Sequence, residues 1–267
     1  MRRHLWIWQV AILMAIFGLW QLLAQPDLVP PVVWENPNRA AFFFGEPVKI
    51  FKVIWVWFSE GTIYQRLWVT LQETALAFVI GSGLGLAFGL WLGLSPTASA
   101  LLDPYITAMN AMPRVVLAPI FMVWFGLGIW SKVALGVTLV FFIVFFNVYQ
   151  GVKEVSPVVL NNTVMLGANR KQLLRYVYLP SATSWVFSSL HISVGMAFVG
   201  AVVGEYLGSA KGVGYLIQQA EGAFDINTVF AGILVLTAFA LVLDFAVGRV
   251  EKRLLVWRPG QSETEQL

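Results

Sequence analysis

The chain has 267 residues, of which 58% are hydrophobic and 12% are charged, whereas about 25% of the residues of a soluble domain are charged. Polar side chains are too few to cover a soluble globule, so most of the chain is expected to face lipid. With no Cys and two His, disulfides, thiolate chemistry and a His-rich metal centre are excluded, and the formal net charge of +3 fits the basic loops of a membrane protein better than nucleic-acid binding.

The first predicted element is an uncharged stretch, Leu5–Pro26, which is long enough to cross a bilayer. A cleaved signal peptide is the alternative, but its apolar core is usually about 7–15 residues long and ends in a small-x-small site. Residues 22–26 do not form such a site. The stretch therefore predicts a retained membrane anchor.

A polar, Pro-rich segment, Asp27–Arg66, follows this anchor. Within it, apolar residues recur every three or four positions over Val48–Phe58, which predicts an amphipathic helix lying along the membrane surface. Residues 1–66 are therefore predicted to form an N-terminal unit of one span, an extracytoplasmic loop and an interfacial helix.

The next apolar stretch, Thr74–Leu102, contains no charged residue and carries a regular series of glycines. Small residues spaced four apart let two helix backbones approach closely, which favours helix packing in lipid. A packing seam within the chain is favoured here over a functional gate. The seam residues are Gly81, Gly85, Gly89 and Gly93.

Four further apolar stretches bring the predicted spans to about six, which indicates an all-α integral membrane protein. They are Leu101–Phe125, which three prolines interrupt, Val133–Val152, Trp185–Leu207 and Thr228–Val247. Basic residues near span ends favour the cytoplasmic side, so both termini and residues 153–182 are predicted to be cytoplasmic. Residues 67–250 then form a core of five spans, and 251–267 form a cytoplasmic tail.

The loop 153–182 has clear helix signals. Ser156 and Pro157 form a helix start, and Gly167 supplies the left-handed residue that often ends a helix. Asn169 can cap a second helix that Pro180 is expected to end. A DNA-reading helix–turn–helix is physically possible, but between two membrane spans a protein-docking element fits better.

This loop resembles the cytoplasmic loop of ABC importer permeases, the binding-protein-dependent family with the MetI-like fold. That family carries the pattern Glu-Ala-Ala-x3-Gly, then about a dozen residues and Leu-Pro, and this chain departs from it at the Glu-Ala-Ala positions. The resemblance implies that the loop couples the permease to an ATPase. The residues implied are Asn161, Asn162, Thr163, Gly167, Ala168, Asn169, Arg170, Leu173, Leu179 and Pro180.

Similar fragments continue over residues 60–258. Pro113-Arg114-Val115, 124–128, 147–152, 204–208 and 212–217 resemble the branch that transports nitrate, sulfonates, taurine or bicarbonate. The branch also includes permeases for thiamin pyrimidine precursors and riboflavin. The resemblance implies no cofactor in this chain, ATP and magnesium in a separate ATPase, an extracytoplasmic binding protein, a second permease copy and the bacterial inner membrane.

Charged residues within the spans are the candidates for lining a solute pathway. Asp103 and Arg114 lie eleven positions apart, so on one helix they would share a face. Either Arg114 meets an anionic solute or it pairs structurally with Asp103 or a neighbouring carbonyl, and Glu205 is either a gate or a structural hydrogen-bond acceptor. An intramembrane enzyme would need convergent acids and bases, which the sequence does not show. A secondary transporter typically has broken spans at matching positions in both halves, and the Pro-broken third span has no obvious counterpart in the sixth. A channel or structural membrane protein would leave the docking loop unexplained.

Overall fold

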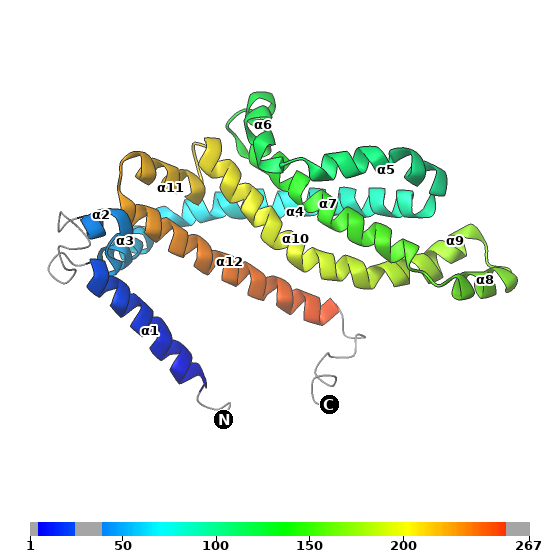
Figure 1. Cartoon of the computed structure of the whole chain (residues 1–267), viewed down its shortest axis with the longest axis horizontal. Helices are drawn as coiled ribbons and strands as arrows, with labels where there is room; N and C mark the ends of the chain where they lie inside the picture. The colour runs from blue at the N-terminus through cyan, green and yellow to red at the C-terminus, as the bar shows by residue number, and fades with distance from the viewer. Residues whose placement is uncertain (1–4, 25–38, 255–267) are drawn as a thin grey trace. The chain divides into compact units, whose positions relative to one another are not determined.

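The computed structural model describes residues 5–24 and 39–254, and all regular elements in these ranges are helices (Figure 1). Residues 25–38 and 255–267, including Pro26, Asp27 and most of the predicted tail, lie outside the described residues. The helices are α1 (Leu5–Ala24), α2 (Arg39–Phe44), α3 (Pro47–Ser59), α4 (Thr62–Leu94), α5 (Pro96–Ala111), η2 (Arg114–Leu117), α6 (Ala118–Phe125), α7 (Ile129–Lys153), α8 (Pro157–Met165), α9 (Arg170–Leu173), η3 (Leu174–Tyr178), α10 (Leu179–Gly208), α11 (Val213–Gly222) and α12 (Ile226–Leu254).

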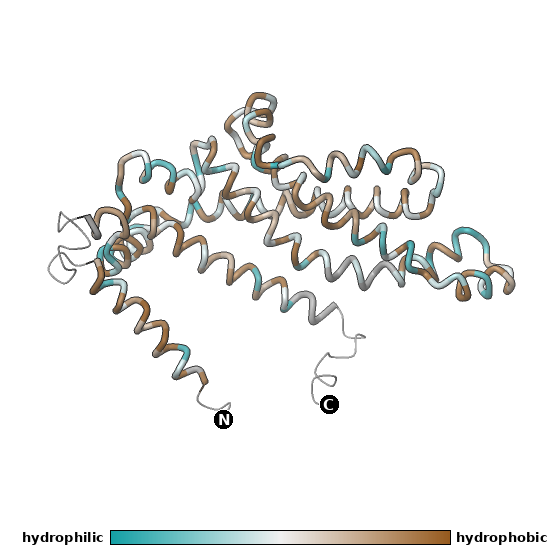
Figure 2. The backbone as a smooth tube through the Cα atoms, in the orientation of Figure 1, coloured by the Kyte–Doolittle hydropathy of each residue, from teal (hydrophilic) through white to brown (hydrophobic). Residues whose placement is uncertain are grey.

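The membrane-spanning character predicted from composition is confirmed. Five helical segments of the described chain are long and apolar enough to cross a membrane, and a bent pair of helices makes up to six. Figure 2 shows hydrophobic residues along α1 and α12, with more hydrophilic residues around α8 and α9. The fold is therefore an all-helical membrane fold with five or six spans.

The chain forms two compact units, of which the first combines residues up to Trp68 with Lys211–Ala238. In this unit Asn227 Oδ1 accepts a hydrogen bond from the Glu46 backbone N–H at 2.8 Å, just before α3 begins. The helix α3 matches the predicted amphipathic segment: Ile50 is buried, whereas Trp55 is exposed. The helix therefore packs one face and leaves the other available for lipid.

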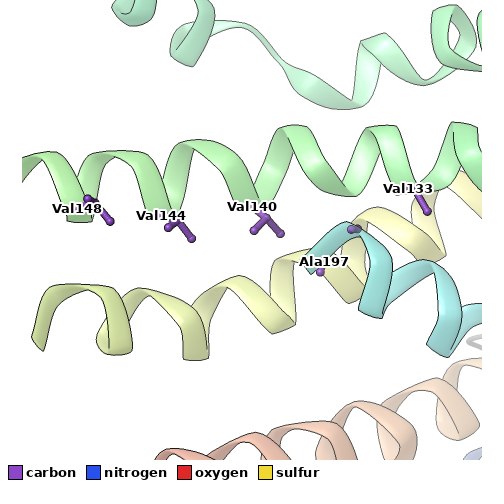
Figure 3. Packing of buried hydrophobic residues seen from close by; sticks show 6 residues of the cluster. Val133, Val140, Val144, Val148 and Ala197 are labelled. Atoms are coloured by element: carbon purple, nitrogen blue, oxygen red, sulfur yellow. The ribbon is translucent and has the colours of Figure 1, made fainter. Parts of the chain in front are cut away.

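The second unit contains Val69–Ala210 and the described residues from Phe239 onward, which end at Leu254. Its core is built where α4, α7 and α10 meet, and Figure 3 shows valines of α7 along one side of that helix with Ala197 of α10 nearby. The glycine series of α4 lies directly against this row. A Cβ on each glycine would come within 3.0 Å of valine side-chain carbon; the pairs are Gly81 with Val140, Gly85 with Val144, Gly89 with Val148, and Gly93 with Val152.

The stretch predicted as one span over Thr74–Leu102 is divided, and that prediction was wrong. The helix α4 ends at Leu94, and the Ser95 hydroxyl accepts a hydrogen bond from the backbone N–H of Ala98 at 3.4 Å. Pro96 then occupies the first turn of α5, where its missing N–H costs nothing. A Ser-Pro helix start therefore interrupts an apolar run that composition alone reads as continuous.

The third predicted span, Leu101–Phe125, is sharply bent. Its two parts, 96–111 and 114–125, meet at 86°. Met112 has φ −68° and ψ +133°, the extended conformation that a following proline favours, and Pro113 also is extended. The prolines therefore change the direction of the chain here rather than merely kinking a straight span.

Candidate functional site

The loop between α7 and α10 projects an apolar tip. Met165 and Leu166, at the end of α8, are 85% and 88% exposed. Asn161 and Asn162 on α8 are exposed as well, and the Thr163 hydroxyl donates to the Val159 carbonyl at 2.7 Å. Figure 1 shows α8 and α9 beyond the ends of α7 and α10, which pack side by side. The tip is therefore placed where a partner can reach it.

Gly167 makes the turn at this tip. Its φ is +83°, and no atom lies within 4 Å of where a Cβ would be. The Gly167 N–H bonds the Val164 carbonyl at 2.9 Å, and the Ala168 N–H bonds the Thr163 carbonyl at 3.2 Å. These two bonds form a Schellman motif, which closes the end of α8 with glycine in the left-handed conformation.

Asn169 caps the next helix with a complete capping box. Its side-chain oxygen accepts from the Gln172 backbone N–H at 2.9 Å, while the Gln172 side chain accepts from the Asn169 N–H at 2.8 Å. Two backbone donors at the helix start are thereby satisfied. Arg170 is exposed at the start of α9, and Leu173 is half-buried, so the loop has one polar and one packed side.

The prediction that Pro180 ends this helix was wrong. The chain runs from α9 through a π-helical turn, η3, directly into α10, so Leu179 and Pro180 lie in its first turn. The Leu179 N–H bonds the Leu174 carbonyl, five residues back. Proline disrupts the ordinary i−4 pattern, and a wide π turn accommodates such a disruption without breaking the helix. The second half of the loop, α9 and η3, therefore continues into the following span α10 without a break in the helical structure.

Arg114 and Asp103 do not share a helix face, which corrects the spacing argument. Asp103 is exposed on α5, whereas Arg114 lies beyond the bend in η2. The Arg114 guanidinium donates to the Asn110 carbonyl at 3.2 Å and to the Asn110 side chain, and it stacks over the Phe142 ring at 4.7 Å. The arginine is thus held at the bend by an amide and an aromatic ring.

Glu205 is completely buried near the end of α10. Its Oε1 accepts from the Thr70 hydroxyl at 2.6 Å, and Glu73, which lies three residues after Thr70 on α4, interacts with it. Lys132 is also buried and interacts electrostatically with both glutamates. Glu73 and Lys132 each lie one position before a predicted span, Thr74–Leu102 and Val133–Val152 respectively, so this cluster was not predicted from the sequence. Longer helices, which begin at Thr62 and Ile129, bring both residues inside.

His191 lies within the predicted span Trp185–Leu207 and belongs to α10. Its Nε2 lies 3.0 Å from Asp244 Oδ1, and the two side chains line a small pocket between α10 and α12 within the second unit. Both side chains are partly exposed. The histidine is therefore paired with an aspartate at a surface between two helices.

Comparison with known proteins agrees with this architecture. The family described as "Binding-protein-dependent transport system inner membrane component" matches residues 81–256. A Bacillus subtilis (strain 168) protein named as an aliphatic sulfonates transport permease, SsuC, is 29% identical over 96% of this chain and 90% of its own length. The formylaminopyrimidine transport permease protein ThiX of Halalkalibacterium halodurans is 31% identical, over 86% of this chain and 93% of its own.

Among solved structures, the chain is similar to an inward-facing conformation of the MetNI methionine ABC transporter. The TM-score is 0.62 at 17% sequence identity, and the match covers 71% of this chain and 94% of that one. At this identity the match establishes the fold. The predicted MetI-like permease fold is therefore confirmed.

Proposed function

The chain belongs to the family of binding-protein-dependent transport system inner membrane components, and from that premise we propose that its α8–α9 loop docks onto a separate ATPase while its spans form the pathway of a small solute. As a permease subunit of an ABC importer it is a non-catalytic, multi-pass membrane component that works with an ATPase and a binding protein. ATP and magnesium belong to the ATPase partner. This role explains why so much of the loop is exposed.

The observation that supports docking most strongly is the construction of the loop. An exposed apolar tip at Met165 and Leu166 is held by the Schellman turn at Gly167 and the capping box at Asn169. Exposed apolar patches of this kind mark protein-interaction sites. Because η3 continues into α10 without a break, displacement of the tip is carried into the membrane span as a rigid-body motion.

Substitution of Gly167 by Glu tests the docking proposal. A non-glycine residue in the left-handed conformation costs about 1–2 kcal/mol, and the new side chain would project from an open position on the docking surface. We expect uptake to be lost while the permease still inserts and the ATPase still hydrolyses ATP. Gly167→Asn is the matched control, because Asn tolerates this conformation. Normal uptake by the Glu variant would contradict docking at this loop.

For the solute we propose a small anion of the sulfonate type. The named solute of SsuC is an aliphatic sulfonate, and Arg114 supplies a cation at the bend between α5 and α6. A thiamin pyrimidine precursor, as the name of ThiX suggests, or riboflavin is the alternative. Binding assays on the partner binding protein, with a sulfonate and a pyrimidine compared directly, decide between them.

The pathway is proposed to lie between two copies of this permease, with Asp103 and Arg114 as candidate lining residues, whereas the burial of Glu205 within one copy favours its structural alternative. Both termini and the α8–α9 loop are proposed to face the cytoplasm. A secondary transporter is the competing class. Solute uptake that persists after deletion of the ATPase subunit would favour that class, whereas uptake that stops on deletion supports the importer.

A further inference from the structure

We propose that Glu73, Glu205 and Lys132 form a charge-neutral cluster that holds one proton inside the membrane and positions the loop after α6 for transport. The three residues come from α4, α10 and α7, respectively, and all belong to the second unit. The transport part of this inference rests on the proposed function. The part concerning charge and the proton rests on geometry alone.

The cluster is deeply buried. Glu73, Glu205 and Lys132 are each at most 1% exposed, so none of the three charges can be stabilised by bulk solvent. An ionised carboxylate or ammonium group buried alone is very costly, and such groups persist only when paired and hydrogen-bonded. The net charge of the cluster must therefore be close to zero.

Counting charges shows that one proton is required. Two ionised glutamates and one protonated lysine would leave a net charge of −1, and one added proton removes it. Ionised carboxylates only accept hydrogen bonds, whereas a protonated carboxyl group can donate one to its neighbour. One proton on the glutamate pair therefore balances the charge and allows one carboxyl group to donate to the other.

The neighbours of the two carboxyl groups place this proton on Glu73. The Thr70 hydroxyl donates to Glu205 Oε1 at 2.6 Å and so favours the ionised form of Glu205. By contrast, Glu73 Oε2 is buried and has no hydrogen-bond partner among the described residues. A buried oxygen without a hydrogen-bond donor destabilises a neutral carboxylic acid far less than it destabilises an ionised carboxylate. Glu73 is therefore the donor of the pair and Glu205 the acceptor.

Lys132 connects this pair to the loop that follows α6. Its Nζ donates to the Leu127 carbonyl at 2.6 Å and to the Gly128 carbonyl at 3.0 Å. Its stem packs on α10 at Gly204, where a Cβ would meet Lys132 Cγ at 2.9 Å. One side chain thus holds two carbonyls of the α6–α7 loop next to the end of α10 that lies opposite the α8–α9 loop. Motion of α10 is thereby transmitted to the bent α5–α6 segment.

A charge-balance series tests the cluster without any transport measurement. Glu73→Gln and Glu205→Gln each leave one carboxylate facing Lys132, so each complex is expected to remain assembled. The double variant leaves the lysine charge uncompensated and is expected to lower Tm by about 10 °C or to prevent assembly. Adding Lys132→Met to the double variant should restore Tm. A stable double variant, or no recovery in the triple variant, would overturn the proposal.

Infrared difference spectroscopy of the intact complex tests the proton directly. The wild-type protein should show the carbonyl stretch of a buried carboxylic acid, and this band should disappear in Glu73→Gln and also in Glu205→Gln, where the remaining glutamate ionises beside Lys132. Glu60→Gln, at an exposed position, is the control and should keep the band. A wild-type spectrum without the band, or a band that survives both substitutions, would overturn the proposal.

The triple variant then separates positioning from stability. It is neutral and folded but has lost the contacts from Lys132 to Leu127 and Gly128, so uptake is expected to fall at least about tenfold while ATP hydrolysis continues. Unchanged uptake would overturn the positioning role. Wild-type uptake that does not depend on the ATPase would instead overturn the proposed function and leave the charge and infrared results standing.

Discussion

Gly83 and Gly85 lie two positions apart on α4, yet their surroundings differ completely. No atom lies within 4 Å of a Cβ placed on Gly83, whereas a Cβ on Gly85 would lie 2.8 Å from both the Phe141 carbonyl oxygen and Val144 Cβ. Both glycines lie in the same apolar stretch of α4, so the composition of the stretch does not distinguish them. Only the four-residue spacing indicates which glycine meets a neighbouring backbone.

This difference predicts opposite results for two alanine substitutions. Gly85→Ala must push α4 and α7 apart, and overpacking of this kind costs about 1–3 kcal/mol. Gly83→Ala adds a methyl group to open space and improves helix propensity, so it should leave stability unchanged or raise it. Thermal unfolding of the two purified variants measures the difference, and equal Tm values would contradict close packing at Gly85.

A second prediction at the residue scale concerns Arg114. If the solute is an anion that meets this guanidinium, Arg114→Gln removes a charged hydrogen bond worth about 1.5–3 kcal/mol and raises the KM of uptake about tenfold or more. Asn110→Ala removes the neighbouring amide but keeps the charge, so it serves as the control. An unchanged KM in the Gln variant would argue for a neutral solute or a purely structural arginine.

At the scale of single elements, the two helices of the docking loop are capped differently. Asn169 makes both bonds of a capping box, whereas Ser156, which also precedes a helix, makes no side-chain capping bond. Sequence patterns assign the same signal to both residues. Only the backbone geometry shows which cap contributes to stability.

Asn169→Ala should therefore weaken the loop, and Ser156→Ala should not. Loss of an N-cap costs about 0.5–2 kcal/mol, which is enough to raise hydrogen exchange of backbone amides throughout α9. Asn169→Asp keeps an acceptor at the same position and should behave like the wild type. If Ser156→Ala loosened the loop as much as Asn169→Ala, the capping interpretation would fail.

The sequence predicted which elements exist better than where they end. The predicted helix Val48–Phe58 and the span Val133–Val152 correspond to α3 and α7, which are one to four residues longer at each end. Two errors fall at prolines, because proline starts a helix at Pro96 and is accommodated within one at Pro180, whereas α4 and α7 simply begin earlier than their apolar stretches do. Which outcome occurs depends on the neighbouring backbone, and no single-sequence pattern contains that information.

In the candidate site, the sequence patterns also failed to predict which charged residues are buried. Glu205 was singled out because it lies within a predicted span, but Glu73 and Lys132 each lie one position before a predicted span and so were not considered. Their burial arises from pairing across three helices. Contacts of this kind join residues more than 50 positions apart and leave no local periodicity to detect.

For the whole molecule, the lack of cysteine makes the topology directly measurable, because a single introduced cysteine reports without background. Leu166→Cys and Phe224→Cys each place a thiol at an exposed position, 88% and 72% exposed. With α10 crossing the membrane between them, an impermeant reagent outside the cell should label position 224 and not 166. Labelling of both from the same side would contradict the proposed orientation.

The repeated valine-against-glycine contacts between α4 and α7 also limit how this permease can change shape. Successive contacts are spaced four residues apart, or about 6 Å along each helix. If α7 slid along α4 by less than that distance, Val140 and Val144 would leave the space next to the glycines and meet larger side chains of α4. Shear between these two helices is therefore blocked, and they move together as one stiff body. A change of shape that opens or closes a passage must then occur where a helix is interrupted. The 86° bend at Met112 and Pro113 is such a place, because rotation about a few backbone bonds there would reorient the whole α6 segment.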